Sequence, residues 1–174
     1  MSKSIDKNSI RFIQNVDQAI SVMSNAGKWL LDTGKNPSKW WQLQNLNREF
    51  LLQYAKPEEF YVALVDEKPA AAAIFQIDQN AQDWKSVDKS QPHKALYIHW
   101  LCVNRQFAGM GLPKIMVDCA AEKAQENNTS LLRADTTASV TKLRKIYEDV
   151  GFSLMAIEKE DYRETAFYQK RVGE

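Results

Sequence analysis

The sequence has little cysteine and almost no net charge. Its 174 residues include only two cysteines, and a disulfide framework or a metal site would need more partners than these. Cys102 and Cys119 both lie in apolar, periodic surroundings, so we expect them to be reduced and buried. The 23 basic and 22 acidic side chains leave a net charge of +1. That balance gives no support to a nucleic-acid or membrane-surface role, which would need a basic excess.

Long apolar runs are also missing. None approaches the roughly 20 residues that a membrane-spanning helix requires. The first twenty residues contain no apolar segment of the kind that a signal peptide needs. We therefore expect a soluble, cytoplasmic protein with no metal and no membrane or nucleic-acid partner. Hydrophobic residues make up 44% and charged residues 26% of the chain, which is typical of a globular protein. The length fits one domain, residues 1–174.

Hydrophobic periodicity predicts eleven elements in the order strand, two helices, three strands, helix, strand, helix and two strands. Early hairpin strands followed by helix-linked strands indicate a mixed sheet with helices on its faces. We predict an α/β (α+β) fold, with a mixed, mostly antiparallel sheet of about seven strands flanked by about four helices. The expected strands are 10–16, 60–65, 70–77, 95–103, 131–134, 152–157 and 165–171; the expected helices are 38–54, 112–127, 139–150 and one capped by Asp17 and Gly34.

A long polar segment, residues 78–93, separates two of these strands. Connections of this length are uncommon in compact domains and are often functional. Trp84 is its only large aromatic residue, and we expect it to pack as core or lid. Asp78, Asp83 and Asp88 are spread along the segment, and we expect them to be solvated.

The strongest chemical signal is a short glycine loop between a strand ending at Val103 and a helix starting near Leu112. Gly109 and Gly111 can adopt positive φ angles and allow a ligand to approach the backbone. Pro113 suits the first turn of a helix, where its missing N–H costs nothing. Such a junction directs backbone N–H groups and the positive helix end at one place, which suits a phosphate or pyrophosphate.

Two alternatives compete with this interpretation. Two glycines can simply make a tight turn between a strand and a helix, because short glycine motifs arise by chance. A dinucleotide-binding fingerprint would need a small third residue where Lys114 stands, and it would normally open the fold. The loop lies late in the chain, after a hairpin, and we reject the dinucleotide interpretation.

Two motifs resemble those of the GCN5-related N-acetyltransferase (GNAT) family. Residues 106–111, Gln-Phe-Ala-Gly-Met-Gly, match the signature Q/R-x-x-G-x-G/A, and residues 97–103 are similar to the strand that precedes it in the family. Residues 143–152 resemble the second motif, in which Tyr-Glu is followed two residues later by Gly-Phe. The element order agrees from residue 10 to residue 172. The resemblance implies transfer of an acetyl group from acetyl-CoA directly to a primary amine of a small molecule or peptide.

The family resemblance also implies where the coenzyme binds. Backbone groups of Leu101 and Val103 would pair with the pantetheine amides, as an added strand would. Backbone N–H groups of the glycine loop would hold the pyrophosphate. Two positions depart from the family pattern: Pro113 removes one donor, and Val140 stands where many relatives have Asn. The implied coenzyme-binding residues are Leu101, Cys102, Val103, Ala108, Gly109, Met110, Gly111, Leu112, Pro113 and Tyr147.

Two residues are candidates for catalysis. The resemblance gives Tyr147 the role of general acid, because a phenol with a reference pKa near 10 can protonate a departing thiolate. Tyr147 also fits an ordinary core position on an apolar helix face. His99 is the candidate base, since it stands where many relatives have Glu and histidine titrates near neutral pH. A core histidine beside Trp100 is the alternative, and His93 in the polar segment is expected to be solvated.

The acceptor and the wider function stay open. The resemblance places Trp40, Trp41, Phe50 and Tyr54 on the elements that wall the acceptor site, although core packing explains each of them equally well. A non-catalytic acyl-CoA-binding module is one alternative function. An acyltransferase with another acyl donor or acceptor is a second. A homodimer is one possible state of assembly.

Overall fold

The computed structural model describes residues 5–34, 38–77, 84–89, 94–159 and 164–173. The chain forms two compact units, Met1–Ile74 with Trp100–Met116 and Phe75–His99 with Val117–Glu174. Two strands, β3 (Lys68–Ile77) and β4 (Leu96–Val103), contribute residues to both units.

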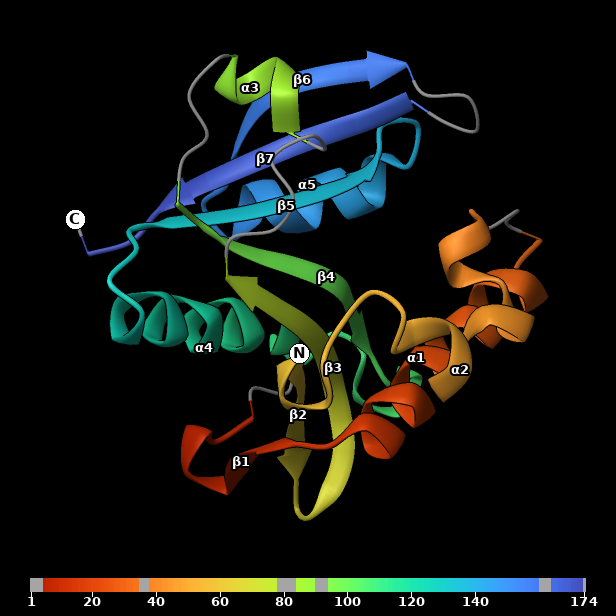
Figure 1. The fold of residues 1–174 in the computed structure, drawn as a ribbon. Helices are drawn as coiled ribbons and strands as arrows, with labels where there is room; N and C mark the ends of the chain where they lie inside the picture. Colours follow the sequence, from red (N-terminus) through yellow and green to blue (C-terminus); the bar gives the residue numbers. More distant parts are fainter. Residues whose placement is uncertain (1–4, 35–37, 78–83, 90–93, 160–163, 174) are drawn as a thin grey trace. The chain divides into compact units, whose positions relative to one another are not determined.

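The strands follow the order β1-β2-β3-β4-β5-β7-β6 (Figure 1). Of the pairings whose register is described, β4–β5 is parallel and the others are antiparallel, so the predicted mixed, mostly antiparallel sheet of seven strands is confirmed. The expectation of one domain over residues 1–174 stays a prediction. The other strands are β1 (Ile10–Gln14), β2 (Phe60–Val65), β5 (Leu131–Thr137), β6 (Ser153–Lys159) and β7 (Glu164–Arg171).

Five α-helices occur in the described ranges, and two of them are single turns. The other three match predicted helices, whereas the predicted helix 38–54 is wrong. Its residues form two 3₁₀ turns and one helical turn, because Gln42 and Asn47 adopt extended conformations and the Asn47 side chain caps the next turn. The α-helices are α1 (Val16–Asp32), α2 (Arg48–Leu51), α3 (Lys85–Asp88), α4 (Leu112–Glu126) and α5 (Thr141–Asp149).

The first unit packs α1 against the β1–β3 sheet (Figure 1). α1 begins at Val16, one residue before the predicted cap Asp17, and its actual cap is Asn15, whose Oδ1 accepts a hydrogen bond from the Gln18 N–H. The hairpin between β2 and β3 turns on Asp66 and Glu67, both at positive φ, so the second strand starts earlier than predicted. The buried core joins α1 to the strands: Val16, Ala19, Val22, Met23, Ala26, Phe60, Val62, Leu64, Ala72 and Ile74.

In the second unit, β5 pairs with β4 on one side and β7 on the other, and α5 packs on β5 (Figure 1). β5 extends to Thr137, three residues beyond the prediction, because Asp135 to Thr137 continue the ladder with β7. The parallel ladder with β4 ends earlier, at Ile98 opposite Ala134.

A buried ion pair anchors the short helix α3 in the second unit. The Arg133 guanidinium donates two hydrogen bonds to the Asp88 carboxylate, at 2.6 and 2.9 Å, and only 1% and 3% of the two side chains is exposed. Arg133 also donates to Tyr97 and Gln169. Burial alone would lower the pKa of Arg133, but its hydrogen bonds to Asp88 and Tyr97 outweigh this and raise it. The expectation that Asp88 is solvated is therefore wrong, while Asp78 and Asp83 lie outside the described residues.

Trp84 completes this anchor and confirms the packing role expected for it. Its ring is fully buried, packs edge-on against Phe167 and Tyr97, and lies 4.7 Å from the Arg133 guanidinium carbon. Its indole N–H has no hydrogen-bond partner within the described ranges. The end of the polar segment is thus part of the core of this unit.

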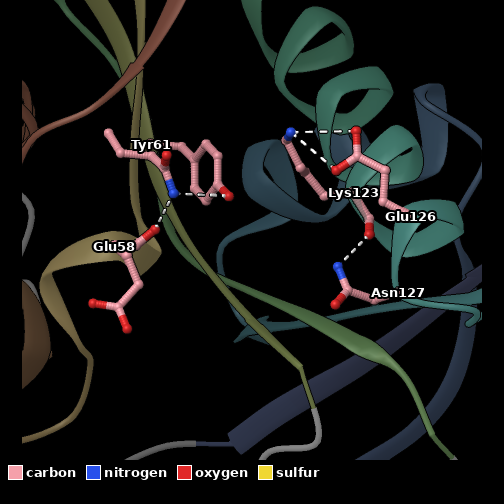
Figure 2. A network of polar contacts seen from close by, with 6 residues as sticks. Glu58, Tyr61, Lys123, Glu126 and Asn127 are labelled. Carbon is pink, nitrogen blue, oxygen red and sulfur yellow. Dashed lines mark hydrogen bonds and ion pairs between the residues drawn. The ribbon is translucent and has the colours of Figure 1, made fainter.

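Polar contacts fix the ends of two elements (Figure 2). In the first unit, the Gln14 side-chain amide at the end of β1 donates to the Glu58 carbonyl and the Tyr61 hydroxyl, at 2.6 and 3.2 Å. In the second unit, Asn127 closes α4 by donating to the Lys123 carbonyl at 2.8 Å, and Lys123 pairs with Glu126.

In the part of the chain that the structure describes, no helix is long and apolar enough to cross a membrane.

Candidate active site

The glycine loop between β4 and α4 has the conformation that the sequence predicts. Gly109 and Gly111 have φ angles of +78° and +80°, in the left-handed region where other residues are strained by roughly 1–2 kcal/mol. A Cβ atom built on either glycine would meet nothing within 4 Å. The glycines are therefore required by the backbone conformation, and the space beside them is open to a ligand.

Four consecutive backbone donors of this loop are free. Among the described residues, none accepts a hydrogen bond from the N–H groups of Gly109, Met110, Gly111 or Leu112. The Gly111 carbonyl accepts from Ile115 at 3.3 Å, so the loop runs directly into the first turn of α4, whose positive end favours an anion. Pro113, in that turn, has no N–H to add. The loop therefore fits a phosphate or pyrophosphate group.

The end of β4 leads into this loop. Leu101 and Val103 are half-buried, while the Cys102 side chain lies in the core of the first unit with its Sγ 3.7 Å from the Ala72 carbonyl oxygen. Burial raises the pKa of the Cys102 thiol, so it stays protonated and unreactive. Both cysteines are free and buried, as predicted, and burial raises the pKa of Cys119 to about 11. Cys102 can take part in coenzyme binding only through its backbone.

Trp100 interrupts the regular geometry of β4. Its φ is +51°, which is unusual for a bulky residue within a strand and often marks a functional region. His99, the preceding residue, is half-buried. Strict alternation of side chains along the strand does not extend across Trp100, so the spacing of His99 and Val103 does not decide whether their side chains lie on the same side of the sheet.

Trp100 also joins β4 to the aromatic residues expected on the acceptor side. Its indole N–H donates to the Trp40 carbonyl at 2.8 Å, and the two rings pack edge-on with centroids 5.8 Å apart. Trp40 contacts the rings of Phe50 and Tyr54 at 6.0 and 5.1 Å, and 45% of Tyr54 is exposed. Trp41 packs against the core instead. Three of the four predicted residues thus form one cluster, and Trp100 is the member that the sequence did not reveal.

In the second unit, the end of α5 explains why Tyr147 is followed by glycine and phenylalanine at this spacing. Gly151 has a φ of +97° and donates to the Glu148 carbonyl, while Phe152 donates to the Tyr147 carbonyl at 3.0 Å. These two bonds are the Schellman motif that ends many helices. The Phe152 ring packs edge-on against Tyr147, with centroids 5.5 Å apart. The motif therefore fixes both the helix end and the position of the tyrosine ring.

Tyr168 on β7 holds the other side of the Tyr147 ring. The two rings stack with centroids 5.8 Å apart and an interplanar angle of 22°. The Tyr168 hydroxyl donates to Glu148 at 2.8 Å and accepts from Arg144 at 2.9 Å. Burial, together with the bond to Glu148, raises the pKa of Tyr168. Tyr147 itself is 8% exposed, so both its neighbours and its helix constrain its orientation.

The predicted site residues fall into two groups. All coenzyme-binding residues from Leu101 to Pro113 lie in the first unit, whereas His99 and Tyr147 belong to the second. Val140, at the position where relatives often have Asn, is the N-cap of α5 and makes no side-chain capping bond. Within the described ranges, no three His, Cys, Asp or Glu side chains form a group that could hold a metal.

This combination defines an α/β protein with a glycine loop of free backbone donors after its fourth strand. The model of the acetyltransferase (GNAT) family matches residues 28–152, which is well over half of the sequence. The chain therefore belongs to the GNAT acetyltransferase family, and by that membership it is an acyl-CoA-dependent N-acetyltransferase. A search of curated proteins finds no match.

Solved structures show the same fold. A GNAT acetyltransferase from Streptococcus agalactiae has a TM-score of 0.76 and 16% identity, covering 98% of this chain and all of the other. One from Listeria monocytogenes has a TM-score of 0.68 and 22% identity, covering 94% of each chain. The Salmonella typhimurium protein yncA, solved with its cofactor acetyl-CoA, has a TM-score of 0.65 and 11% identity, covering 96% of each chain. At these identities the likeness concerns the fold alone.

Proposed function

We propose that this protein transfers an acetyl group from acetyl-CoA directly to a primary amine of a small molecule or peptide. The observation that carries the proposal is the row of four free N–H groups from Gly109 to Leu112 at the start of α4. Together with family membership, it supports binding of the coenzyme pyrophosphate at the glycine loop. Acetyl-CoA supplies the activated thioester; the chain binds it and places the reacting groups.

The coenzyme would be held along the end of β4 and the glycine loop. We propose that the backbone groups of Leu101, Cys102 and Val103 contact the pantetheine arm, in the manner of an added strand. The Cys102 thiol plays no part, because it is buried. The pyrophosphate is assigned to the segment from Ala108 to Pro113, where Gly109 to Leu112 supply the free donors.

In the proposed reaction, the amine nitrogen attacks the thioester carbonyl carbon. The C–N bond forms, the C–S bond breaks, and the electron pair of that bond leaves on the coenzyme sulfur. Tyr147 gives the sulfur a proton as general acid, and its clamped ring supports a fixed direction for this transfer. Before this attack, His99 removes one proton from the acceptor ammonium, because an alkyl ammonium with a pKa near 10.4 is mostly protonated at neutral pH. The second nitrogen proton, which is lost as the amide forms, returns to the Tyr147 phenolate.

Release of free coenzyme thiol tests the proposal. With acetyl-CoA and a panel of primary amines, we expect thiol release that depends on at least one amine, and an acetylated product with one acetyl group on nitrogen. Mass spectrometry counts the acetyl groups on the product, and their resistance to hydroxylamine, which cleaves esters but not amides, distinguishes nitrogen from oxygen acetylation. Binding of the coenzyme with no turnover across the panel would instead support a non-catalytic acyl-CoA-binding module. Turnover only with a longer acyl donor would support another acyltransferase.

The role of His99 predicts a change in pH dependence. We expect the variant His99→Ala to lose activity mainly below about pH 8, where the amine most needs a base, and to approach the wild-type rate at higher pH. The rate of amine acetylation between pH 6 and 9.5 measures this. His93→Ala is the matched control, because it removes the other histidine of the chain. An unchanged pH profile in His99→Ala would make His99 a structural residue.

A further inference from the structure

Two residues of α1 contact Arg105, near the start of the glycine loop. The Asn25 Oδ1 accepts a hydrogen bond from the backbone N–H of Arg105 at 2.9 Å. The Arg105 guanidinium carbon lies 4.0 Å from the centre of the Trp29 ring. Asn25 and Trp29 are four residues apart, so they share one face of the helix. One helix face thus holds both the backbone and the side chain of Arg105.

Arg105 lies two residues after the end of β4. It opens the 3₁₀ turn Arg105–Phe107, and Asn104 before it donates its backbone N–H to the Ala70 carbonyl at 2.8 Å. The Asn104 side chain caps the same turn by accepting from the Gln106 N–H. The entry to the loop is therefore tied to β3 by Asn104 and to α1 by Arg105, and the free N–H groups begin four residues later at Gly109.

The Arg105 side chain has no other described partner. Among the described residues, none of the carboxylates pairs with its guanidinium, and none accepts a side-chain hydrogen bond from it. An arginine positioned over an indole ring makes an energetically favourable contact that restrains the guanidinium. Stacking on Trp29 is thus the described interaction that orients this side chain, and it acts together with Asn25.

We propose that Asn25 and Trp29 are positioning residues for the coenzyme. They hold Arg105, and through it the start of the glycine loop, so that the N–H groups from Gly109 to Leu112 converge on the coenzyme pyrophosphate. Preorganised donors bind an anion more tightly because less ordering is needed on binding. This inference rests on the proposed coenzyme site at the glycine loop. It adds to that site two residues that act through their contacts with Arg105.

Kinetics with two acetyl donors test this role. In Asn25→Leu and Trp29→Leu we expect the KM for acetyl-CoA to rise about 5-fold, the effect of losing one modest hydrogen bond or stacking contact. We expect kcat to stay within about 2-fold, because the reacting groups are unchanged. With S-acetyl-pantetheine, which has no phosphates, KM should not change. Trp29→Phe keeps an aromatic face and should restore most of the affinity, and Lys28→Ala on the same helix is the control.

A second measurement does not require activity. Hydrogen exchange of residues 105–112 should be faster in Asn25→Leu than in the wild type, and bound coenzyme should slow it in both. The inference is overturned if KM is unchanged, if it rises equally for both donors, or if exchange in this segment is unaffected. The outcome that contradicts the proposed function is different: the wild-type protein would then bind neither acetyl-CoA nor coenzyme A.

Discussion

Replacing Tyr147 by phenylalanine should lower kcat for amine acetylation by roughly 100-fold, the lower range for losing a general acid. The variant keeps the ring, which packs against Phe152 and Tyr168, and loses only the hydroxyl that would protonate the coenzyme sulfur. The dissociation constant of acetyl-CoA, measured by calorimetry, should stay within about 3-fold, since the loop donors that hold the pyrophosphate are backbone groups. The loss should therefore appear in kcat rather than in coenzyme binding.

Tyr168→Phe is the matched control for this variant. It removes a hydroxyl from the neighbouring stacked ring, which breaks the hydrogen bonds to Arg144 and Glu148. That change should cost about 1 kcal/mol in the free energy of unfolding and leave kcat nearly unchanged. If Tyr147→Phe retains full turnover, Tyr147 is a packing residue of α5 and a different group protonates the sulfur. If both variants lose activity equally, the hydrogen-bonded network around Tyr168 matters more than the Tyr147 hydroxyl.

Local backbone chemistry made parts of the site predictable. The two glycines of the loop and Gly151 stand where φ is positive, and each was recognisable because glycine adopts that conformation without strain. The helix α4 follows Gly111 and carries proline in its first turn, as the sequence indicates. The spacing from Tyr147 to Phe152 was predictable for the same local reason, because a Schellman motif favours a glycine and places the next residue against the helix.

Contacts between distant residues were not predictable in this way. Asp88 is 45 residues from Arg133, and its polar neighbours in the sequence suggested a solvated loop. Trp100 and Trp40 are 60 residues apart, and nothing local to Trp100 signals its positive φ. The sequence around Asn25 gives no sign of its contact with Arg105, because the two residues are 80 positions apart. Helix 38–54 was predicted because apolar spacing does not reveal the cap at Asn47.

Breaking the buried pair Asp88–Arg133 should have a large effect on stability. We expect Asp88→Ala to lower the free energy of unfolding by about 3–5 kcal/mol, because it leaves a guanidinium uncompensated at 1% exposure. Arg133 would keep its bonds to Gln169 and Tyr97, but these neutral partners do not balance its charge. Urea-induced unfolding of the purified variant measures the loss. The exposed pair Arg11–Glu67 is the control, and Glu67→Ala should leave the free energy of unfolding nearly unchanged, because solvent screens an exposed ion pair.

Replacing both partners distinguishes the cost of an unpaired charge from the worth of the ion pair. In Asp88→Ala/Arg133→Met we expect most of the stability lost in Asp88→Ala to return, because a methionine carries no charge and fills much of the same volume between Trp84 and Tyr97. The hydrogen bonds to α3 are absent in both variants. The difference between their free energies of unfolding therefore measures the cost of leaving the Arg133 charge unpaired. A double variant as unstable as Asp88→Ala would mean that the pair is needed to hold α3 on the sheet. Recovery of stability in the double variant would mean that Asp88 stabilises the protein mainly by neutralising the buried Arg133.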